Sequence, residues 1–170
     1  MRTSTIDQAV CALKRGEAVI FPTETVYGLG VSVEAAAGPD VLYDLKERDR
    51  GKPISWLVGD ADDLDRYGAR VPELARRLAG AYWPGPLTLV VRAADEVPEA
   101  FRSNAGTIGL RMPDNATALA LVRAAGCPLA TTSANLSGRA AAGALDALDP
   151  KLAARVGTIV PDGADDDKSG

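Results

Sequence analysis

The chain of 170 residues contains no histidine. Histidine is the commonest general base near neutral pH and a frequent metal ligand. Its absence excludes a Ser-His-Asp triad and leaves a serine nucleophile without its usual activating base. Any chemistry therefore has to rest on hydroxyl groups, carboxylates, backbone groups and cationic side chains.

Cysteines and long apolar runs are also scarce. The two cysteines, Cys11 and Cys127, lie in apolar surroundings without metal-like spacing, so we expect two buried free thiols in a reducing compartment. There is no run of about 18 apolar residues, the length that a membrane helix needs. The start, Met1-Arg2-Thr3-Ser4, lacks the apolar core of a signal peptide. These features predict a cytoplasmic protein that does not enter a membrane.

Positive charge is not in excess, because the net charge is -4 and the sequence pI is about 4.9. General nucleic-acid binders carry a basic excess, so we expect contact with RNA to be weak or indirect. The chain also lacks a G-x-x-x-x-G-K-[ST] phosphate loop. Asp62, Asp63 and Asp65 follow a surface-helix pattern, which we interpret as a solvated face, and we predict no metal site.

The apolar patterns that are present predict alternating helices and strands. We expect helices at residues 4–15, 38–47, 60–67, 72–82, 115–125 and 144–156, and strands at residues 17–22, 54–58, 87–91, 107–111, 129–132 and 158–160. Two of these strands follow each other without a full helix between them. The sequence therefore predicts an α+β fold with a twisted mixed sheet flanked by helices.

The segment after the first strand, Pro22-Thr23-Glu24-Thr25-Val26-Tyr27-Gly28-Leu29-Gly30, presents polar side chains at a strand end. Such strand-end loops are where α/β proteins place ligand groups. We expect the two glycines to form a turn, with a positive φ or a close backbone approach. A polar turn with its own capping hydroxyls explains the same pattern, so both interpretations stand.

Three further groups have both a functional and a structural interpretation. The first is a cationic cluster of Lys46, Arg48, Arg50 and Lys52, which forms either an anion site or a solvated cap at the end of a helix. Three nearby carboxylates, Asp44, Glu47 and Asp49, partly neutralise its charge. The hydrogen-bonding groups of 131–135 hold a polar ligand or cap a turn. Arg111 is a ligand contact or an ion-pair partner.

Taken in order, these motifs resemble the YrdC/TsaC family. The resemblance rests on the opening segment with Phe21, Lys46-x-Arg48 with Lys52-Pro53, Trp83-Pro84-Gly85-Pro86-Leu87-Thr88, Gly109-Leu110-Arg111-Met112-Pro113, and Thr132-Ser133-Ala134-Asn135-Leu136-Ser137-Gly138. It implies a YrdC/RibB-like fold around a concave cavity, formed by residues 1–170 as a single domain.

The resemblance also implies an activity, threonylcarbamoyl-AMP synthase. Such nucleotidyltransferases join L-threonine, bicarbonate or CO₂, and ATP into threonylcarbamoyl-AMP and pyrophosphate. Mg²⁺ accompanies the ATP phosphates, and a separate complex transfers the product to position 37 of tRNAs that read ANN codons, giving t6A. Alternatives are an RNA- or ribosome-associated binding protein without catalysis, and carbamoyl transfer through carbamoyl-adenylate.

Roles for individual residues follow from the same resemblance. The threonine-binding residues would be Thr25, Arg111 and Thr131; the ATP-binding residues would be Arg48, Lys52, Thr107, Ser133 and Asn135; and the catalytic residues would be Lys46 and Arg48.

The chain departs from the family pattern at three places. Leu57 stands near a position where some members carry a histidine, and residues 139–142 lack a serine that is common there. The sequence ends at Gly170, near the point where the family continues into a Ser-Thr-Val-Val-Asp-like closing segment. We therefore expect weak activity from these 170 residues.

Overall fold

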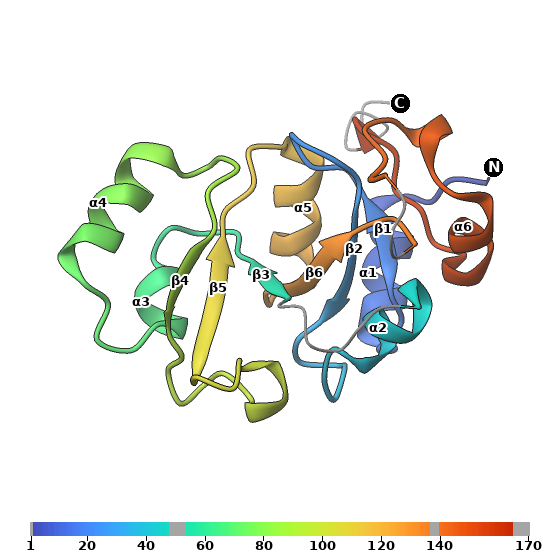
Figure 1. Ribbon diagram of the computed structural model, residues 1–170. Helices are drawn as coiled ribbons and strands as arrows, with labels where there is room; N and C mark the ends of the chain where they lie inside the picture. The colour runs from blue at the N-terminus through green and yellow to red at the C-terminus, as the bar shows by residue number, and fades with distance from the viewer. Residues whose placement is uncertain (1, 48–53, 137–139, 165–170) are drawn as a thin grey trace.

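The computed structural model describes residues 2–47, 54–136 and 140–164 (Figure 1). Its α-helices are α1 (Ile6–Lys14), α2 (Asp40–Lys46), α3 (Asp63–Tyr67), α4 (Glu73–Tyr82), α5 (Ala116–Ala125) and α6 (Pro150–Val156). Short 3-10 helices span Glu99–Phe101 and Leu145–Ala147. The strands are β1 (Val19–Phe21), β2 (Gly28–Ser32), β3 (Ser55–Leu57), β4 (Leu89–Arg92), β5 (Thr107–Arg111) and β6 (Leu129–Ser133).

The strands form one mixed sheet in the order β1-β2-β6-β3-β5-β4. In the described residues, β3 and β5 are the parallel pair, and the other neighbours are antiparallel. A parallel pair needs a long crossover, and the chain between β3 and β5 supplies it with α3, α4 and β4. The predicted α+β class with a mixed sheet is confirmed.

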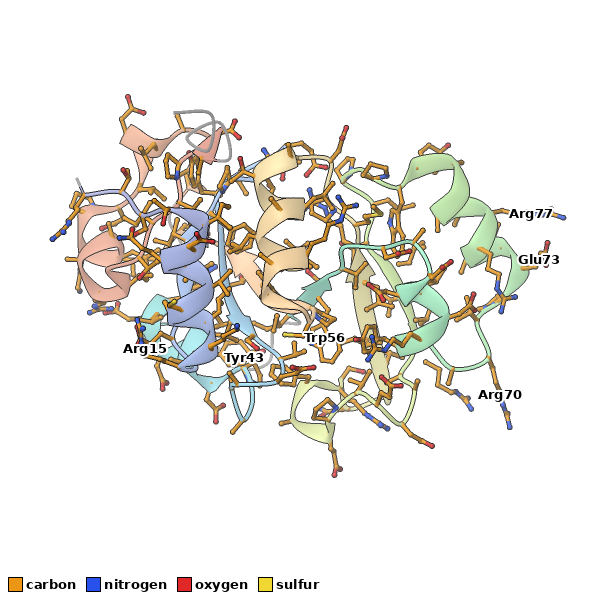
Figure 2. The ribbon with its side chains drawn as sticks, turned by 180° about the vertical axis from the view of Figure 1, so that it is seen from behind. Arg15, Tyr43, Trp56, Arg70, Glu73 and Arg77 are labelled. Atoms are coloured by element: carbon orange, nitrogen blue, oxygen red, sulfur yellow. The ribbon has the colours of Figure 1, made fainter. Side chains whose placement is uncertain are left out.

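Alternation along β1 divides the core between the two faces of the sheet. Val19 and Phe21 pack with α1 and α5, whereas Ile20 packs with Leu42 of α2 and Leu152 of α6. Successive strand residues point to opposite faces, which explains this division. Seen from behind, α1 and α5 lie side by side in front of the sheet (Figure 2). Helices α3 and α4 lie beside β4, at the other end of the molecule (Figure 1).

Helix α1 has a side-chain cap at its N-terminus. Thr5 is the N-cap, and its hydroxyl and the side chain of Gln8 form a reciprocal capping box. The preceding residue, Ser4, donates its backbone N–H to the carbonyl oxygen of Ile159 at 2.7 Å, which joins the start of α1 to the C-terminal part of the chain.

The predicted glycine turn at Gly28 and Gly30 is wrong, because both residues lie inside β2. Neither has a positive φ. The expected close approach is present: a Cβ on Gly30 would lie 3.0 Å from the Phe21 ring and 3.1 Å from Cγ2 of Thr131. A side chain at position 30 would therefore have to displace the Phe21 ring or Thr131 by a few tenths of an ångström.

The C-terminal elements also differ from the expectation. The single helix predicted over 144–156 is broken, and α6 begins at Pro150 with Asp149 as its N-cap. Proline disfavours a helical conformation of the preceding residue, so a helix cannot run through this point unperturbed. In place of the predicted strand at 158–160, Ile159 forms one isolated parallel bridge with Ile20.

The two cysteines lie in different environments. Cys127 is buried, with its sulfur 3.2 Å from Oγ of Ser32. Cys11 is exposed, so the expectation of two buried thiols is wrong for this residue. It follows Val10 on α1 and falls outside the buried face of that helix. Among the described helices, none combines the length and apolar character needed to cross a bilayer.

Candidate functional site

A row of small side chains crosses the centre of the sheet. Ser55 of β3 pairs with Gly109 of β5 on one side and with Thr131 of β6 on the other, and Thr131 also pairs with Gly30 of β2. Directly paired residues on neighbouring strands face the same side of a sheet. Phe21 lies against Gly30 and Thr88 lies against Gly109, so the open part of the row is at Ser55 and Thr131.

Ser55 and Thr131 of this row line a hollow of about 160 Å³. Four predicted site residues line it together: Thr25, Arg111, Thr131 and Ser133. Leu57 lines the same hollow, so the apolar side chain stands within the site. At about 30 Å³ per water molecule, this volume has the scale of a small amino acid.

The segment after β1 forms one wall of this small hollow. The Thr23 hydroxyl donates to the carbonyl oxygen of Val26 at 2.6 Å and lies 3.1 Å from the hydroxyl of Thr25. The backbone N–H of Thr25 donates to Oγ1 of Thr23 at 3.2 Å. The capping interpretation of this segment is therefore correct for Thr23, while Thr25 is exposed and faces the hollow.

Arg111, at the end of β5, forms an ion pair with Glu24. Its Nε donates to the carbonyl oxygen of Gly85 at 3.2 Å, and the second carboxylate oxygen of Glu24 accepts the backbone N–H of Asp114. The ion-pair interpretation of Arg111 is thus correct, and the same side chain also lines the small hollow.

Lys46, the last residue of α2, is buried, with 3% of its surface exposed. Its Nζ donates to the carbonyl oxygen of Ser133 at 2.7 Å and to Oγ1 of Thr132 at 3.0 Å. It also lies 3.3 Å from Oγ of Ser133 and from Oδ1 of Asn135. The solvated-cap interpretation is therefore wrong for Lys46, because its ammonium group sits at the end of β6.

Ser133 and Asn135 act as one polar unit around this ammonium group. The Ser133 hydroxyl donates to Oδ1 of Asn135, and Nδ2 of Asn135 donates to the carbonyl oxygen of Leu136 at 3.0 Å. The pair is held in place from both sides, by Lys46 and by the backbone that follows β6.

Glu47 does not contribute its charge to this ammonium group. It caps α2 with a left-handed backbone, φ 57°, and its carboxylate contacts Arg155 at 2.9 Å and Lys151 at 3.3 Å on α6. The hydrogen bonds from Arg155 and Lys151 lower the pKa of Glu47 below its ordinary value. Glu47 thus pairs with cations of α6, while Arg48, Arg50 and Lys52 of the cationic cluster lie outside the described residues.

A larger hollow of about 700 Å³ adjoins the small one. Thr107 lines it, and the Thr107 hydroxyl lies 2.6 Å from that of Ser103. The two hollows share Ser55, Thr131 and Thr132. Thr131 donates its hydroxyl hydrogen to the carbonyl oxygen of Ser55 at 3.2 Å, so its hydroxyl oxygen can still accept a hydrogen bond.

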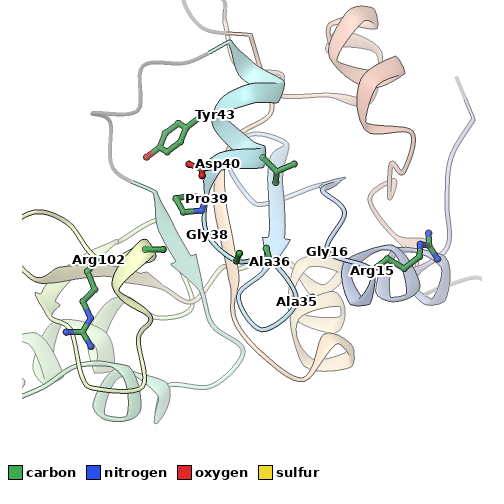
Figure 3. Close-up of a pocket in the computed structure, with 12 residues that line it drawn as sticks. Arg15, Gly16, Ala35, Ala36, Gly38, Pro39, Asp40, Tyr43 and Arg102 are labelled. Carbon is green, nitrogen blue, oxygen red and sulfur yellow. The ribbon is translucent and has the colours of Figure 1, made fainter.

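A third hollow, of about 720 Å³, lies beside the start of α2 (Figure 3). Its lining includes Arg15 and Arg102 on opposite sides and Gly38 between them. The Arg102 side chain donates to the carbonyl oxygens of Val97 and Ala94, and Arg15 pairs with Glu17. We place the candidate site in the other two hollows, although this one is slightly larger, because they contain the motif residues.

Two predicted site residues, Arg48 and Lys52, lie outside the described residues. Sequence reasoning assigned no role to Ser55, and it treated Glu24 and Thr132 only as members of the polar segments 22–30 and 131–135. Glu24 stood within the motif, but its partner Arg111 is 87 residues away in sequence, and no local pattern indicated the contact. No group of three or more metal-ligating side chains occurs within residues 2–47, 54–136 and 140–164.

Comparison with known proteins identifies relatives over most of the chain. The family model Sua5/YciO/YrdC, described as "Telomere recombination", matches residues 11–169. A threonylcarbamoyl-AMP synthase of Bacillus subtilis is 36% identical over 159 residues, which is 93% of this chain and 46% of that protein. A putative threonylcarbamoyl-AMP synthase of Mycobacterium leprae is 38% identical over 162 residues, which is 95% of this chain and 73% of that protein.

Solved structures agree in fold. The Pyrococcus abyssi Sua5 structure in complex with L-threonine superposes with a TM-score of 0.84 at 31% identity, covering 93% of this chain and 46% of that one. The chain thus spans about half the length of several relatives that it matches. Because the family match and the shared fold both extend over nearly all of the sequence, the chain belongs to the Sua5/YciO/YrdC family.

Proposed function

We propose that the chain is a threonylcarbamoyl-AMP synthase. It would join L-threonine, bicarbonate or CO₂, and ATP into threonylcarbamoyl-AMP, with release of pyrophosphate. Relatives carry this name in bacteria, archaea and mammals. The P. abyssi Sua5 structure contains L-threonine.

The observation that carries the proposal is the joining of a small hollow to a large one. The small hollow, of about 160 Å³, has the scale of an amino acid, and the large one, of about 700 Å³, falls in the usual range for a nucleotide-sized ligand. Ser55, Thr131 and Thr132 line both. An amino acid and a nucleotide bound in the two hollows would therefore meet above these residues.

The reaction needs no nucleophile from the protein, which fits a chain without histidine. The amine of threonine forms a carbamate, either with CO₂ and loss of a proton or with bicarbonate and loss of water. A carbamate oxygen then attacks the α-phosphorus of ATP, and the bond to pyrophosphate breaks. Bringing two anionic reactants together requires positioning and electrostatic stabilisation. Cationic side chains and oriented hydrogen-bond donors are the groups that meet this need.

Within this scheme, we assign Thr25, Arg111 and Thr131 to threonine. A guanidinium group such as that of Arg111 suits a carboxylate because it offers paired donors. Their common position on the small hollow supports this assignment.

We assign Thr107, Ser133 and Asn135, together with Arg48 and Lys52, to ATP. Thr107 lines the large hollow, whereas Ser133 lines the small one and is bonded to Asn135. Lys46 and Arg48 would stabilise the charge that develops on the phosphates. The buried ammonium of Lys46 supports a catalytic role, because a charge is stronger where water is excluded.

The remaining expectations belong to the same proposal. Mg²⁺ would enter with the ATP phosphates as part of the substrate. The product would pass to a tRNA-modifying complex for t6A formation, and direct contact with tRNA would be weak. We further propose that residues 1–170 form one domain that acts in the cytoplasm.

Pyrophosphate release from ATP tests the proposal. Release should require L-threonine and bicarbonate together, and omission of either should remove it. Lys46→Ala should abolish release, whereas Lys151→Ala, which removes an exposed lysine of α6, should leave it unchanged. Pyrophosphate release that does not depend on threonine would contradict the proposal. Tight, salt-sensitive binding of RNA without any pyrophosphate release would contradict it as well and would favour a binding protein.

A further inference from the structure

The carboxylate of Glu24 connects the segment after β1 to the end of β5 and the residues just after it. Its Oε1 accepts from Nη2 of Arg111 at the end of β5, and its Oε2 accepts the backbone N–H of Asp114 before α5. The Glu24 and Arg111 side chains are only 18% and 15% exposed. Ion pairs with so little exposure are less screened by water and salt than surface pairs.

The bonds to Glu24 and Gly85 fix the plane of the Arg111 guanidinium group. Nη2 is held by Glu24, and Nε donates to the carbonyl oxygen of Gly85 at 3.2 Å. A guanidinium group has five N–H donors in one rigid plane, so two anchored nitrogens determine where the other donors point. Arg111 lines the small hollow.

Glu24 also lies between two residues, Thr23 and Thr25, that line the small hollow. The hydroxyls of these two threonines lie 3.1 Å apart. Thr25 and Arg111 line the same hollow. The Glu24–Arg111 ion pair therefore ties the wall that carries Thr25 to the wall that carries the guanidinium group.

We propose that Glu24 is a positioning residue, which holds the Arg111 guanidinium group and the Thr25 segment in the orientation that binds an amino-acid carboxylate. This inference rests on the proposed function. Glu24 acts through Arg111 and does not itself contact the substrate. A carboxylate bound in the small hollow meets a guanidinium group that is already oriented, so less conformational freedom is lost on binding.

Calorimetric titration with L-threonine tests this role without relying on turnover. We expect Glu24→Ala to raise the dissociation constant by about tenfold, the effect of losing one charge-assisted contact. Glu24→Gln should recover part of the affinity, because its amide oxygen still accepts a hydrogen bond. The control is Glu17→Ala, which removes a glutamate that pairs with an arginine at an exposed site. This variant should bind L-threonine as tightly as the wild type does.

L-Threonine amide separates positioning from a general loss of structure. The amide lacks the carboxylate that Arg111 would receive, so Glu24→Ala should change its affinity less than twofold. A general distortion of the hollow would weaken both ligands equally and would overturn the inference. Thermal denaturation of each variant accompanies the titrations, and Glu24→Gln serves if Glu24→Ala does not fold.

The failures of the two proposals can be told apart. If the wild type does not bind L-threonine, the proposed function fails at its substrate. If the wild type binds and Glu24→Ala binds equally well or more tightly, the proposed function survives and the positioning role of Glu24 is overturned. A selective loss of L-threonine affinity, with partial recovery in Glu24→Gln, supports both.

Discussion

Nζ of Lys46 lies 2.7 Å from the carbonyl oxygen of Ser133, which joins the end of α2 to the end of β6. The same nitrogen donates to Oγ1 of Thr132 at 3.0 Å. A buried ammonium group with several oxygen partners fixes the geometry of the strand end that lines both hollows. The cation thus has a structural role in addition to its proposed catalytic one.

Replacement of Lys46 by methionine should lower stability, because the side chain keeps its length but loses its charge. The carbonyl oxygen of Ser133 and the Thr132 hydroxyl would lose a buried donor, at a cost of about 1–3 kcal/mol. Chemical denaturation measures the free energy of unfolding. Lys151→Met, at an exposed lysine, should change it by less than about 0.5 kcal/mol; equal effects at the two positions would contradict this account.

Gly30→Ala should destabilise the sheet by about 1–3 kcal/mol, because the new methyl group meets the buried Phe21 ring and Thr131. Gly80→Ala is the matched control. Gly80 lies in α4, and a Cβ there meets nothing within 4 Å. That change should stabilise by about 0.5–1 kcal/mol. Opposite signs in urea denaturation confirm the packing at β2, and a neutral Gly30→Ala would refute it.

The two thiols should react at very different rates with a chromogenic disulfide reagent. Cys11 is exposed and should react in the folded protein, whereas buried Cys127 should react only after denaturant is added. Cys11→Ser should remove the rapid phase and leave one slow thiol. Rapid reaction of both thiols in the folded wild type would contradict the burial of Cys127.

Glu47 at the end of α2 pairs with Arg155 and Lys151 of α6, and these contacts form a clamp between the two helices. This clamp should weaken in acid. Arg155 and Lys151 lower the pKa of Glu47 in the folded state, so the clamp contributes stability above the unfolded-state pKa of about 4.3. That contribution is lost as the pH falls through the lower folded-state value. The difference in melting temperature between wild type and Glu47→Gln should be largest near neutral pH and vanish in acid. A difference that does not vary with pH would exclude the clamp.

The sequence allowed the mixed sheet and the regular helices to be predicted because their apolar patterns are local. Helix α5 follows its predicted range closely, from Asn115 as N-cap to Gly126 with a φ of 76°. Strand β2 was missed because its glycines are typical of turns. They are suited to a strand here only because the Phe21 ring lies against it, and that contact is a property of the assembled sheet.

The site was predictable in its members but not in its connections. Thr25, Arg111, Thr131 and Ser133 were expected to be functional, and one hollow brings them together. Partners separated by more than 80 residues carry no local signal, as in the contact between Lys46 and Thr132, 86 residues apart. For the same reason, no pattern in the sequence indicated that Lys46 would be buried.

Product analysis by mass spectrometry tests the proposed synthase activity most directly. The 170-residue chain, at a concentration equal to that of ATP, is incubated with L-threonine, Mg²⁺ and ¹³C-labelled bicarbonate. We predict a threonylcarbamoyl-AMP ion that is one mass unit heavier than the ion formed with unlabelled bicarbonate, and its loss in Lys46→Ala. Absence of this ion, or an adenylate that carries no label from bicarbonate, would contradict the account.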